Sequence, residues 1–177
     1  MDYAGGVSIE VREVRPNEYG PTGELLYRAF AEYRSPDDPG FDEHLELIRD
    51  VAGRVDRTVV LVAVEDGRVL GSTSIELHGV IGDDDARLPP GVAFVRMVGV
   101  DPEARRRGVA RLLMDEVLRR AREAGVRELR LRTAPVMHAA HRLYESMGFR
   151  RSSDVDLKVS DDFTLWGYRL PLAAEGP

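Results

Sequence analysis

Residues 95–110, with the sequence VRMVGVDPEARRRGVA, decide the fold of this chain. Their apolar start indicates a strand, Asp101-Pro102 ends it, and Gly108 opens a long amphipathic stretch that is typical of a helix. A strand that passes through a short glycine-containing turn into a helix points backbone N–H groups and the positive end of the helix dipole at one place. The stretch therefore predicts a phosphate-binding turn. It is not a Walker P-loop, because no Lys-Ser/Thr pair follows the glycine.

Patterns of strand and helix alternate on both sides of this stretch. We expect strands at residues 7–11, 59–64, 68–77, 95–100, 129–133, 155–159 and 163–170, and helices at residues 23–33, 41–53, 108–124 and 135–147. Because a whole helix separates strand 95–100 from strand 129–133, these two strands are expected to run parallel through a right-handed crossover. The predicted fold class is mixed α/β: a central mixed sheet of about six to seven strands, about four flanking helices, and the turn on the β-α-β crossover.

Local signals add detail to this expectation. Asp66-Gly67 lies between two strand-like runs and predicts a hairpin. Thr22 is expected to cap the helix at 23–33, and Pro135 is expected in the first turn of the last helix. Residues 79–91 contain an aspartate triplet and a proline pair, which together indicate a loop.

The composition excludes several classes of protein. At 177 residues, 43% apolar and 32% charged, we expect one domain over residues 1–177, with a disordered tail at 173–177. The chain has no cysteine and its four histidines show no metal-ligand spacing, so no metal is expected. A net charge of −6 argues against nucleic-acid binding. Without a signal-like start or an apolar run of membrane-spanning length, the chain is expected to be cytoplasmic and not membrane-bound.

Two motifs resemble the GCN5-related N-acetyltransferase (GNAT) superfamily. Arg105-x-x-Gly108-x-Ala110 is similar to the family's pyrophosphate loop, Gln/Arg-x-x-Gly-x-Gly/Ala. About thirty residues later, AAHRLYESMGF at 139–149 is similar to the family pattern Ala-x-x-Leu-Tyr-x-x-x-Gly-Phe. Each motif is weak alone, whereas the pair at this spacing is specific. The resemblance implies an acetyl-coenzyme A-dependent N-acetyltransferase whose amine acceptor attacks the thioester directly.

The resemblance also implies how the co-substrate is held. In the family, the strands equivalent to 95–100 and 129–133 splay apart and take the pantetheine arm between them, and the N–H of Val98 polarises the thioester carbonyl. Backbone N–H groups of the loop cradle the pyrophosphate, with arginine side chains nearby. The implied coenzyme-binding residues are Val98, Val100, Arg105, Arg106, Arg107, Gly108, Val109, Ala110, Arg111 and Ala140.

Tyr144 matches the family tyrosine that protonates the leaving thiolate. A phenol with a pKa near ~10 is neutral at pH 7, and acid catalysis of this kind is worth about 10²- to 10⁴-fold. The alternative is a core aromatic residue. Met137 replaces the family's coenzyme-contacting asparagine, and no glutamate precedes the loop on residues 94–96, so the general base is unassigned. These departures leave open a second function, an acyl-coenzyme A sensor or partner module without catalysis.

The acceptor side is less determined. Glu76 and His78 share one strand face with Ser72 and Ser74 and are candidates for the general base and for substrate binding, although surface strand positions would explain them equally. Tyr33 is a third candidate for substrate binding. The acceptor is expected between the N-terminal helices and the closing strands, near Glu32, Tyr33, Asp83-Asp84-Asp85, Trp166 and Tyr168. An acidic rim there would favour a cationic amine. His138 and His141 are expected on a solvated helix face, and a homodimer is left open.

Overall fold

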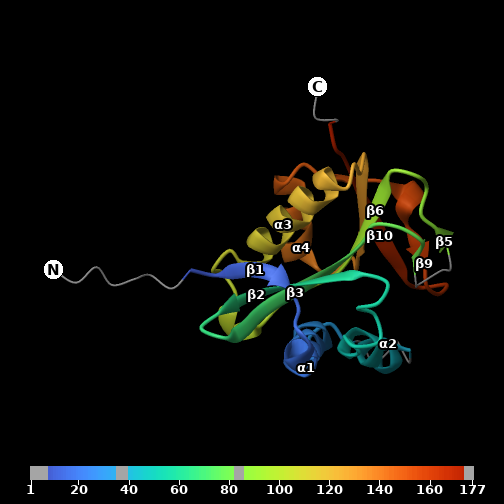
Figure 1. The fold of residues 1–177 in the computed structure, drawn as a ribbon. Coiled ribbons are helices and arrows are strands. Elements are labelled where there is room, and N and C mark those ends of the chain that lie inside the picture. The colour runs from blue at the N-terminus through green and yellow to red at the C-terminus, as the bar shows by residue number, and fades with distance from the viewer. Residues whose placement is uncertain (1–7, 35–39, 82–85, 174–177) are drawn as a thin grey trace. The chain divides into compact units, whose positions relative to one another are not determined.

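The computed structural model describes residues 8–34, 40–81 and 86–173, and its ribbon is drawn in Figure 1. The helices are α1 (Tyr19–Ala31), α2 (Phe41–Arg49), α3 (Val109–Glu123) and α4 (His138–Ser146), with short 3-10 helices η1 (Pro16–Glu18), η2 (Pro102–Ala104) and η3 (Ser153–Val155). The strands are β1 (Glu10–Glu13), β2 (Val59–Glu65), β3 (Arg68–Glu76), β4 (Val80–Ile81), β5 (Ala86–Arg87), β6 (Val92–Val100), β7 (Glu128–Thr133), β8 (Arg150–Arg151), β9 (Leu157–Lys158) and β10 (Thr164–Pro171). The mixed α/β class is confirmed.

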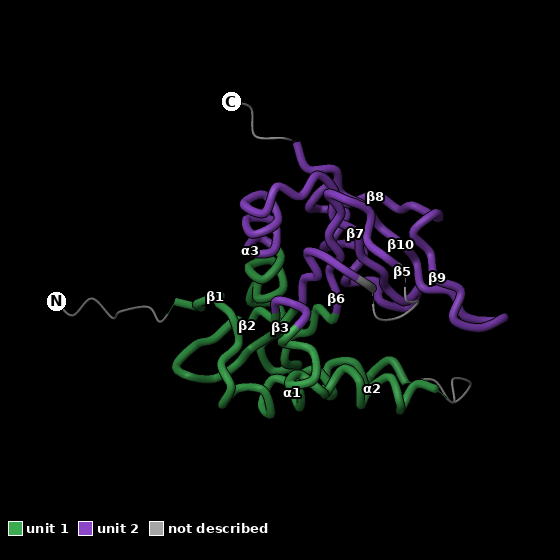
Figure 2. The backbone as a smooth tube through the Cα atoms, turned by 45° about the vertical axis from the view of Figure 1, so that its right-hand side comes forward, with its two compact units in different colours: residues 1–56, 60–73, 97–114 green, residues 57–59, 74–96, 115–177 purple. Residues whose placement is uncertain are grey.

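The main sheet has the strand order β1-β2-β3-β6-β7-β10-β8, with β9 paired to β10. The register of β6 and β7 is parallel, from Val92 opposite Glu128 to Val95 opposite Leu131. This confirms the predicted crossover, because α3 connects the two strands. The chain divides into two compact units, coloured in Figure 2: unit 1 is residues 1–56, 60–73 and 97–114, and unit 2 is residues 57–59, 74–96 and 115–177.

Unit 1 contains α1 and α2, which lie side by side in both views (Figures 1 and 2). Their apolar stripes and the hairpin strands supply one core, formed by Leu25, Leu26, Leu45, Ile48, Val62, Val64 and Val69. Burying side chains of this size contributes about 1.5 to 3 kcal/mol each. The hairpin turns through Asp66 and Gly67, with φ of 49° and 75°, which is the left-handed pair that the Asp-Gly signal predicts.

Unit 2 contains the sheet around β7 and β10, which are antiparallel, with Trp166 opposite Thr133 and Tyr168 opposite Leu131. Alternate residues of β7 are buried, as expected for a strand with one face against the core. Glycine ends α3 as predicted, because Gly125 takes a φ of 69°.

Several predicted boundaries are wrong. Thr22 does not cap a helix, since α1 already begins at Tyr19 and Thr22 is fully buried inside it. Pro135 precedes α4 instead of forming its first turn. The first strand covers Glu10–Glu13 instead of residues 7–11, and the loop 79–91 contains the short strands β4 and β5, because local pairing there supplies backbone hydrogen bonds that composition does not reveal. The aspartate triplet and the end of the tail, 174–177, lie outside the described residues.

Candidate functional site

The phosphate-binding loop predicted from sequence begins at Asp101, the residue after β6. Its N–H donates to the Leu70 carbonyl at 2.8 Å, and its carboxylate accepts the Glu103 N–H at 3.0 Å. Arg28 and Arg68 both donate to the same carboxylate oxygen, at 3.3 and 3.0 Å. Burial alone would raise the pKa of Asp101, but the Glu103 N–H and the Arg68 guanidinium outweigh it and hold the pKa below its usual range. An ionised Asp101 therefore fixes the chain where it enters the loop.

Residues 105–108 carry the chain from η2 into α3. Arg106 and Gly108 are left-handed, with φ of 61° and 76°. Glycine adopts this conformation without steric cost, whereas an arginine there is strained by about 1 kcal/mol. A Cβ atom added to Gly108 would meet no other atom within 4 Å, so this part of the backbone borders open space. The bare main chain at Gly108 can thus be approached closely by a ligand.

Helix α3 begins directly after this glycine. The first helical hydrogen bond runs from the Leu112 N–H to the Gly108 carbonyl at 3.0 Å. The N–H groups of Val109 and Ala110 lie in the first turn and have no acceptor within the helix. The helix dipole adds positive partial charge at the same place, and Arg111 is exposed one residue later. Donors of this kind, at a helix start, suit a phosphate group.

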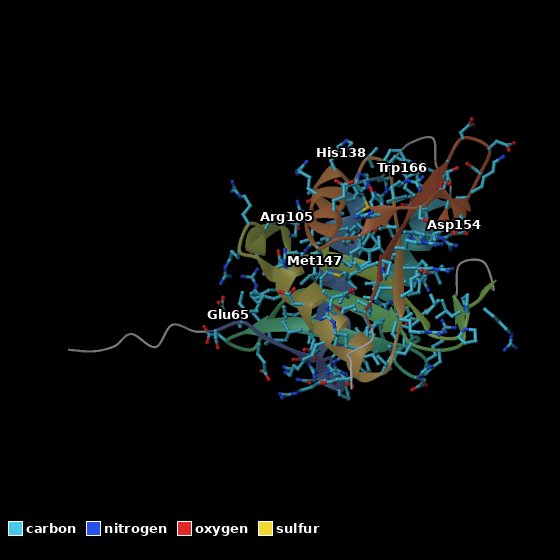
Figure 3. All side chains as sticks on the ribbon, turned by 90° about the horizontal axis from the view of Figure 1, so that it is seen from above. Glu65, Arg105, His138, Met147, Asp154 and Trp166 are labelled. Carbon is cyan, nitrogen blue, oxygen red and sulfur yellow. The ribbon has the colours of Figure 1, made fainter. Side chains whose placement is uncertain are left out.

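The arginine side chains of the loop differ in their pairing. Arg105 forms an ion pair with Glu32 at 2.9 Å, and Arg107 forms one with Glu65 at 2.6 Å. The hydrogen bond from Arg107 lowers the pKa of Glu65. Arg106 is exposed, and within the part of the chain that the structure describes no carboxylate pairs with it. Figure 3 labels Glu65 and Arg105. The predicted arginine cluster is therefore present, but two of its members form ion pairs with carboxylates.

The end of β6 contains a second left-handed residue. Met97 has a φ of 55°, which is unusual for a residue with a side chain, and it packs against the core of unit 1. Val98 and Val100, the neighbouring candidates for coenzyme contact, are half-buried. A left-handed residue interrupts the regular strand geometry beside Val98. The role of the Val98 N–H stays a prediction.

In unit 2, Tyr144 lies on α4 with only 5% of its surface exposed. Its ring centre is 5.9 Å from that of Phe149 and 6.4 Å from that of Tyr168. Tyr168 donates to Glu145 at 3.4 Å, and burial, followed by Glu145, raises the pKa of Tyr168. Ala140, one turn before Tyr144, is half-buried. The tyrosine is thus buried among aromatic rings, and its catalytic role stays a prediction.

The expectation of a solvated helix face is wrong for His141, although His138 is exposed as predicted. His141 is only 8% exposed because its ring stacks on Trp166, with centres 5.4 Å apart and planes at 23°. Its Nε2 lies 3.1 Å from the Ala134 carbonyl; a carbonyl can only accept, so Nε2 donates. His138 and Trp166 are labelled in Figure 3. Helical spacing could have indicated the burial of His141, because it precedes Tyr144 by one turn and therefore lies on the same face of α4.

The acceptor candidates differ in their surroundings. Glu76 is buried instead of lying at the surface, because Arg96 pairs with it at 3.2 Å. His78 is exposed and lies beyond the end of β3, so it does not share a strand face with Glu76. Tyr33 is half-buried just after α1. Residues 83–85 lie outside the described residues.

Within residues 8–34, 40–81 and 86–173, no three His, Asp or Glu side chains are placed to share a metal ion. No helix in those ranges is both long and apolar enough to cross a membrane.

Comparison with known proteins identifies similar chains. The acetyltransferase (GNAT) family matches residues 24–149. N-acetylaspartate synthetase of Rattus norvegicus is 37% identical over 112 residues, which are 63% of this chain and 33% of that protein. Mycothiol acetyltransferase of Geodermatophilus obscurus is 32% identical over 124 residues, 70% of this chain and 38% of that protein. The chain therefore spans about a third of the length of these curated relatives.

Solved structures share the fold. An acetyltransferase of the GNAT family from Staphylococcus aureus Mu50 superposes with a TM-score of 0.70 at 18% identity, over 94% of this chain and all of that one. A GNAT family acetyltransferase from Brucella melitensis, solved in complex with acetyl-CoA, has a TM-score of 0.65 at 20% identity, over 97% of this chain and 93% of that one. At these identities the likeness concerns the fold alone.

Proposed function

The chain belongs to the acetyltransferase (GNAT) family, and we propose that it transfers the acetyl group of acetyl-coenzyme A to a primary amine. The observation that carries the proposal is the loop at residues 105–108. Left-handed Arg106 and Gly108 lead into α3 with bare backbone beside open space. A diphosphate suits such a turn, because main-chain donors and the helix dipole act on the same anion. The family match over residues 24–149 includes this loop.

The residues present fit the co-substrate. Backbone N–H groups from Arg106 to Arg111 bind the pyrophosphate, and Arg106 adds a cation that no carboxylate of the described chain neutralises. Backbone groups of Val98 and Val100 bind the pantetheine arm, and Ala140 is a further coenzyme-binding residue. Acetyl-coenzyme A supplies an acetyl group already activated as a thioester.

The chemistry of the transfer follows from two groups of the chain. The N–H of Val98 donates to the carbonyl oxygen on which negative charge develops, and Tyr144 gives its phenolic proton to the sulfur as the C–S bond breaks. The amine nitrogen forms the new bond to the carbonyl carbon and releases its own proton to water, while coenzyme A leaves as the free thiol. With no cysteine to carry an acyl group, the attack is direct.

The proposal extends to the whole chain. Residues 1–177 form one acetyltransferase domain, since β3 and β6 each contribute residues to both units. The protein acts in the cytoplasm, where acetyl-coenzyme A is available, without nucleic acid or membrane as a partner. Sedimentation of the purified chain tests whether it also forms a homodimer.

Calorimetric titration with acetyl-coenzyme A tests the donor side, and release of free thiol with a panel of amines tests the transfer. We expect saturable binding and amine-dependent thiol release. Binding without turnover for any amine would instead support the acyl-coenzyme A sensor, while a folded protein that takes up no acetyl-coenzyme A would overturn both readings.

A further inference from the structure

We propose that Trp166 is the platform on which the acceptor's apolar part rests, so that the preferred acceptor is a small amine with an aromatic or aliphatic body. This inference rests on the proposed acetyl transfer and names its substrate class. It follows from the position of Trp166 on the sheet, its rigid support and the exposed apolar residues of the segments next to it in sequence, all within unit 2.

Trp166 lies at the edge of the sheet where β7 ends. It is opposite Thr133, the last residue of β7, in the antiparallel pair of β7 and β10. Because β6 runs parallel to β7, this is the carboxyl edge of a parallel pair, and open α/β sheets bind their ligands at that edge. Trp166 is the only tryptophan of the chain, and 37% of it is exposed.

The ring of Trp166 contacts two side chains, one on α4 and one on β8. His141 stacks on it at 5.4 Å, and the guanidinium carbon of Arg151 lies 5.2 Å from its centre. Arg151 is itself fixed, since it donates to the Gly167 carbonyl at 3.1 Å and pairs with Asp156 at 2.6 Å. An aromatic side chain held in this way loses little freedom when a ligand covers it.

Two further exposed apolar residues lie on chain segments that are connected to this edge in sequence. Among the described residues of unit 2, the large exposed hydrophobics are Val136, Val159 and Trp166. Val136 follows β7 by three residues, and the Val159 N–H bonds the Phe163 carbonyl in the hairpin that leads into β10. Exposed apolar residues on segments next to the ends of β7 and β10 favour a binding site for apolar material.

The charged groups around Trp166 narrow the chemical class of the ligand further. The guanidinium of Arg151 already occupies the place that a ligand cation would take over the Trp166 ring. Because this position over the ring is taken, a polyamine gains no cation–π contact there. The reacting amine is neutral when it attacks, so an amine with an apolar body satisfies both conditions. This departs from the cationic acceptor that the acidic loop suggested.

The single tryptophan makes the test direct. The emission of the full chain, saturated with coenzyme A, is recorded while phenethylamine is added, and spermidine at matched ionic strength is the control amine. We expect a saturable change with phenethylamine and none with spermidine. An equal response to spermidine, or no response to phenethylamine, overturns the proposal.

Kinetics separate binding from chemistry. Trp166→Ala should raise the KM for phenethylamine about tenfold with kcat nearly unchanged, and Trp166→Phe should restore most of the loss. Leu47→Ala removes another exposed hydrophobic, 66% exposed on α2, and should leave KM unchanged. A Trp166→Ala variant that folds and keeps its KM overturns the proposal.

The outcomes distinguish this inference from the proposed function. If acetyl-coenzyme A binds and is turned over only with polar amines, the proposal for Trp166 is wrong, while the proposed acetyltransferase function is supported. If acetyl-coenzyme A does not bind, the proposed function fails first. Emission that changes with protein concentration alone, together with a dimer in sedimentation, assigns the apolar edge to a second copy and overturns the platform.

Discussion

The loop of unit 1 and the aromatic cluster of unit 2, formed by His141, Tyr144, Trp166 and Tyr168, present their chemistry in opposite ways. In the loop, the donors are main-chain N–H groups beside a bare Gly108, and two of the three arginines are engaged by Glu32 and Glu65. In the aromatic cluster, side chains present the chemistry, and each ring is positioned by its contact with another. A site made of backbone groups is formed by residues close together in sequence. A site made of side chains depends on tertiary contacts between residues that are distant in sequence.

The largest expected effect comes from a substitution in the backbone site. Gly108→Glu should weaken binding of acetyl-coenzyme A by at least about 100-fold, because the new side chain is strained at a φ of 76° and sets negative charge against a diphosphate. Calorimetry measures the loss. Gly125→Glu is the matched control, since Gly125 ends the same helix with a φ of 69° and equally open surroundings. Unchanged affinity in the Gly108 variant would place the phosphate elsewhere.

The next effect concerns the side-chain site. Tyr144→Phe should lower kcat at least about tenfold by removing the proton for the leaving sulfur, while affinity for acetyl-coenzyme A stays within a few-fold. Tyr168→Phe is the control, because it removes a hydroxyl from the same aromatic cluster, one that donates to Glu145. Equal kcat in the Tyr144 variant and the wild type would leave this tyrosine as a core residue only.

A smaller effect probes the helix that carries the loop's donors. On α3, hydrogen bonding from Arg119, with Arg120 adding to it, lowers the pKa of Glu116 to about 2. The folded pKa lies below the unfolded one, so this stabilisation is complete above pH 4.5 and is lost as the pH falls toward 2. Glu116→Gln should cost about 1 kcal/mol at pH 7, less than the shift alone implies because Arg119 is half exposed.

Urea unfolding as a function of pH measures this effect. The variant should lose part of the acid-induced decline in stability, and its affinity for acetyl-coenzyme A should not change. Glu123→Gln, on an exposed carboxylate of the same helix, is the comparison variant. If both variants follow the wild-type pH curve, Glu116 is not ionised at such low pH through its arginine partners.

The smallest effect separates the contribution of the Arg106 side chain to coenzyme binding from that of the loop backbone. Arg106→Gly removes a cation but relieves a left-handed arginine, so the unfolding free energy should stay equal or rise by up to about 1 kcal/mol. Affinity for acetyl-coenzyme A should fall about threefold, as expected for one exposed charge. A loss as large as that of Gly108→Glu would contradict a backbone-dominated site.

The contrast also explains what the sequence could predict. The loop, the crossover and the Asp66-Gly67 hairpin depend on neighbours in the chain, so spacing and turn chemistry were sufficient. The burial of His141 and of Glu76 could not be predicted, because it depends on Trp166 and Arg96, which are distant in sequence. Likewise, no local pattern showed that two loop arginines would be engaged by Glu32 and Glu65.

Each compact unit is assembled from three separate stretches of the chain, with changeovers just before and inside β2 and inside β3, β6 and α3. No single cut, terminal truncation or simple gene fusion can therefore deliver either unit by itself. Exchange of one unit with a relative would require several coordinated crossovers, so we expect such enzymes to diversify by point substitution around a fixed scaffold more readily than by shuffling of modules.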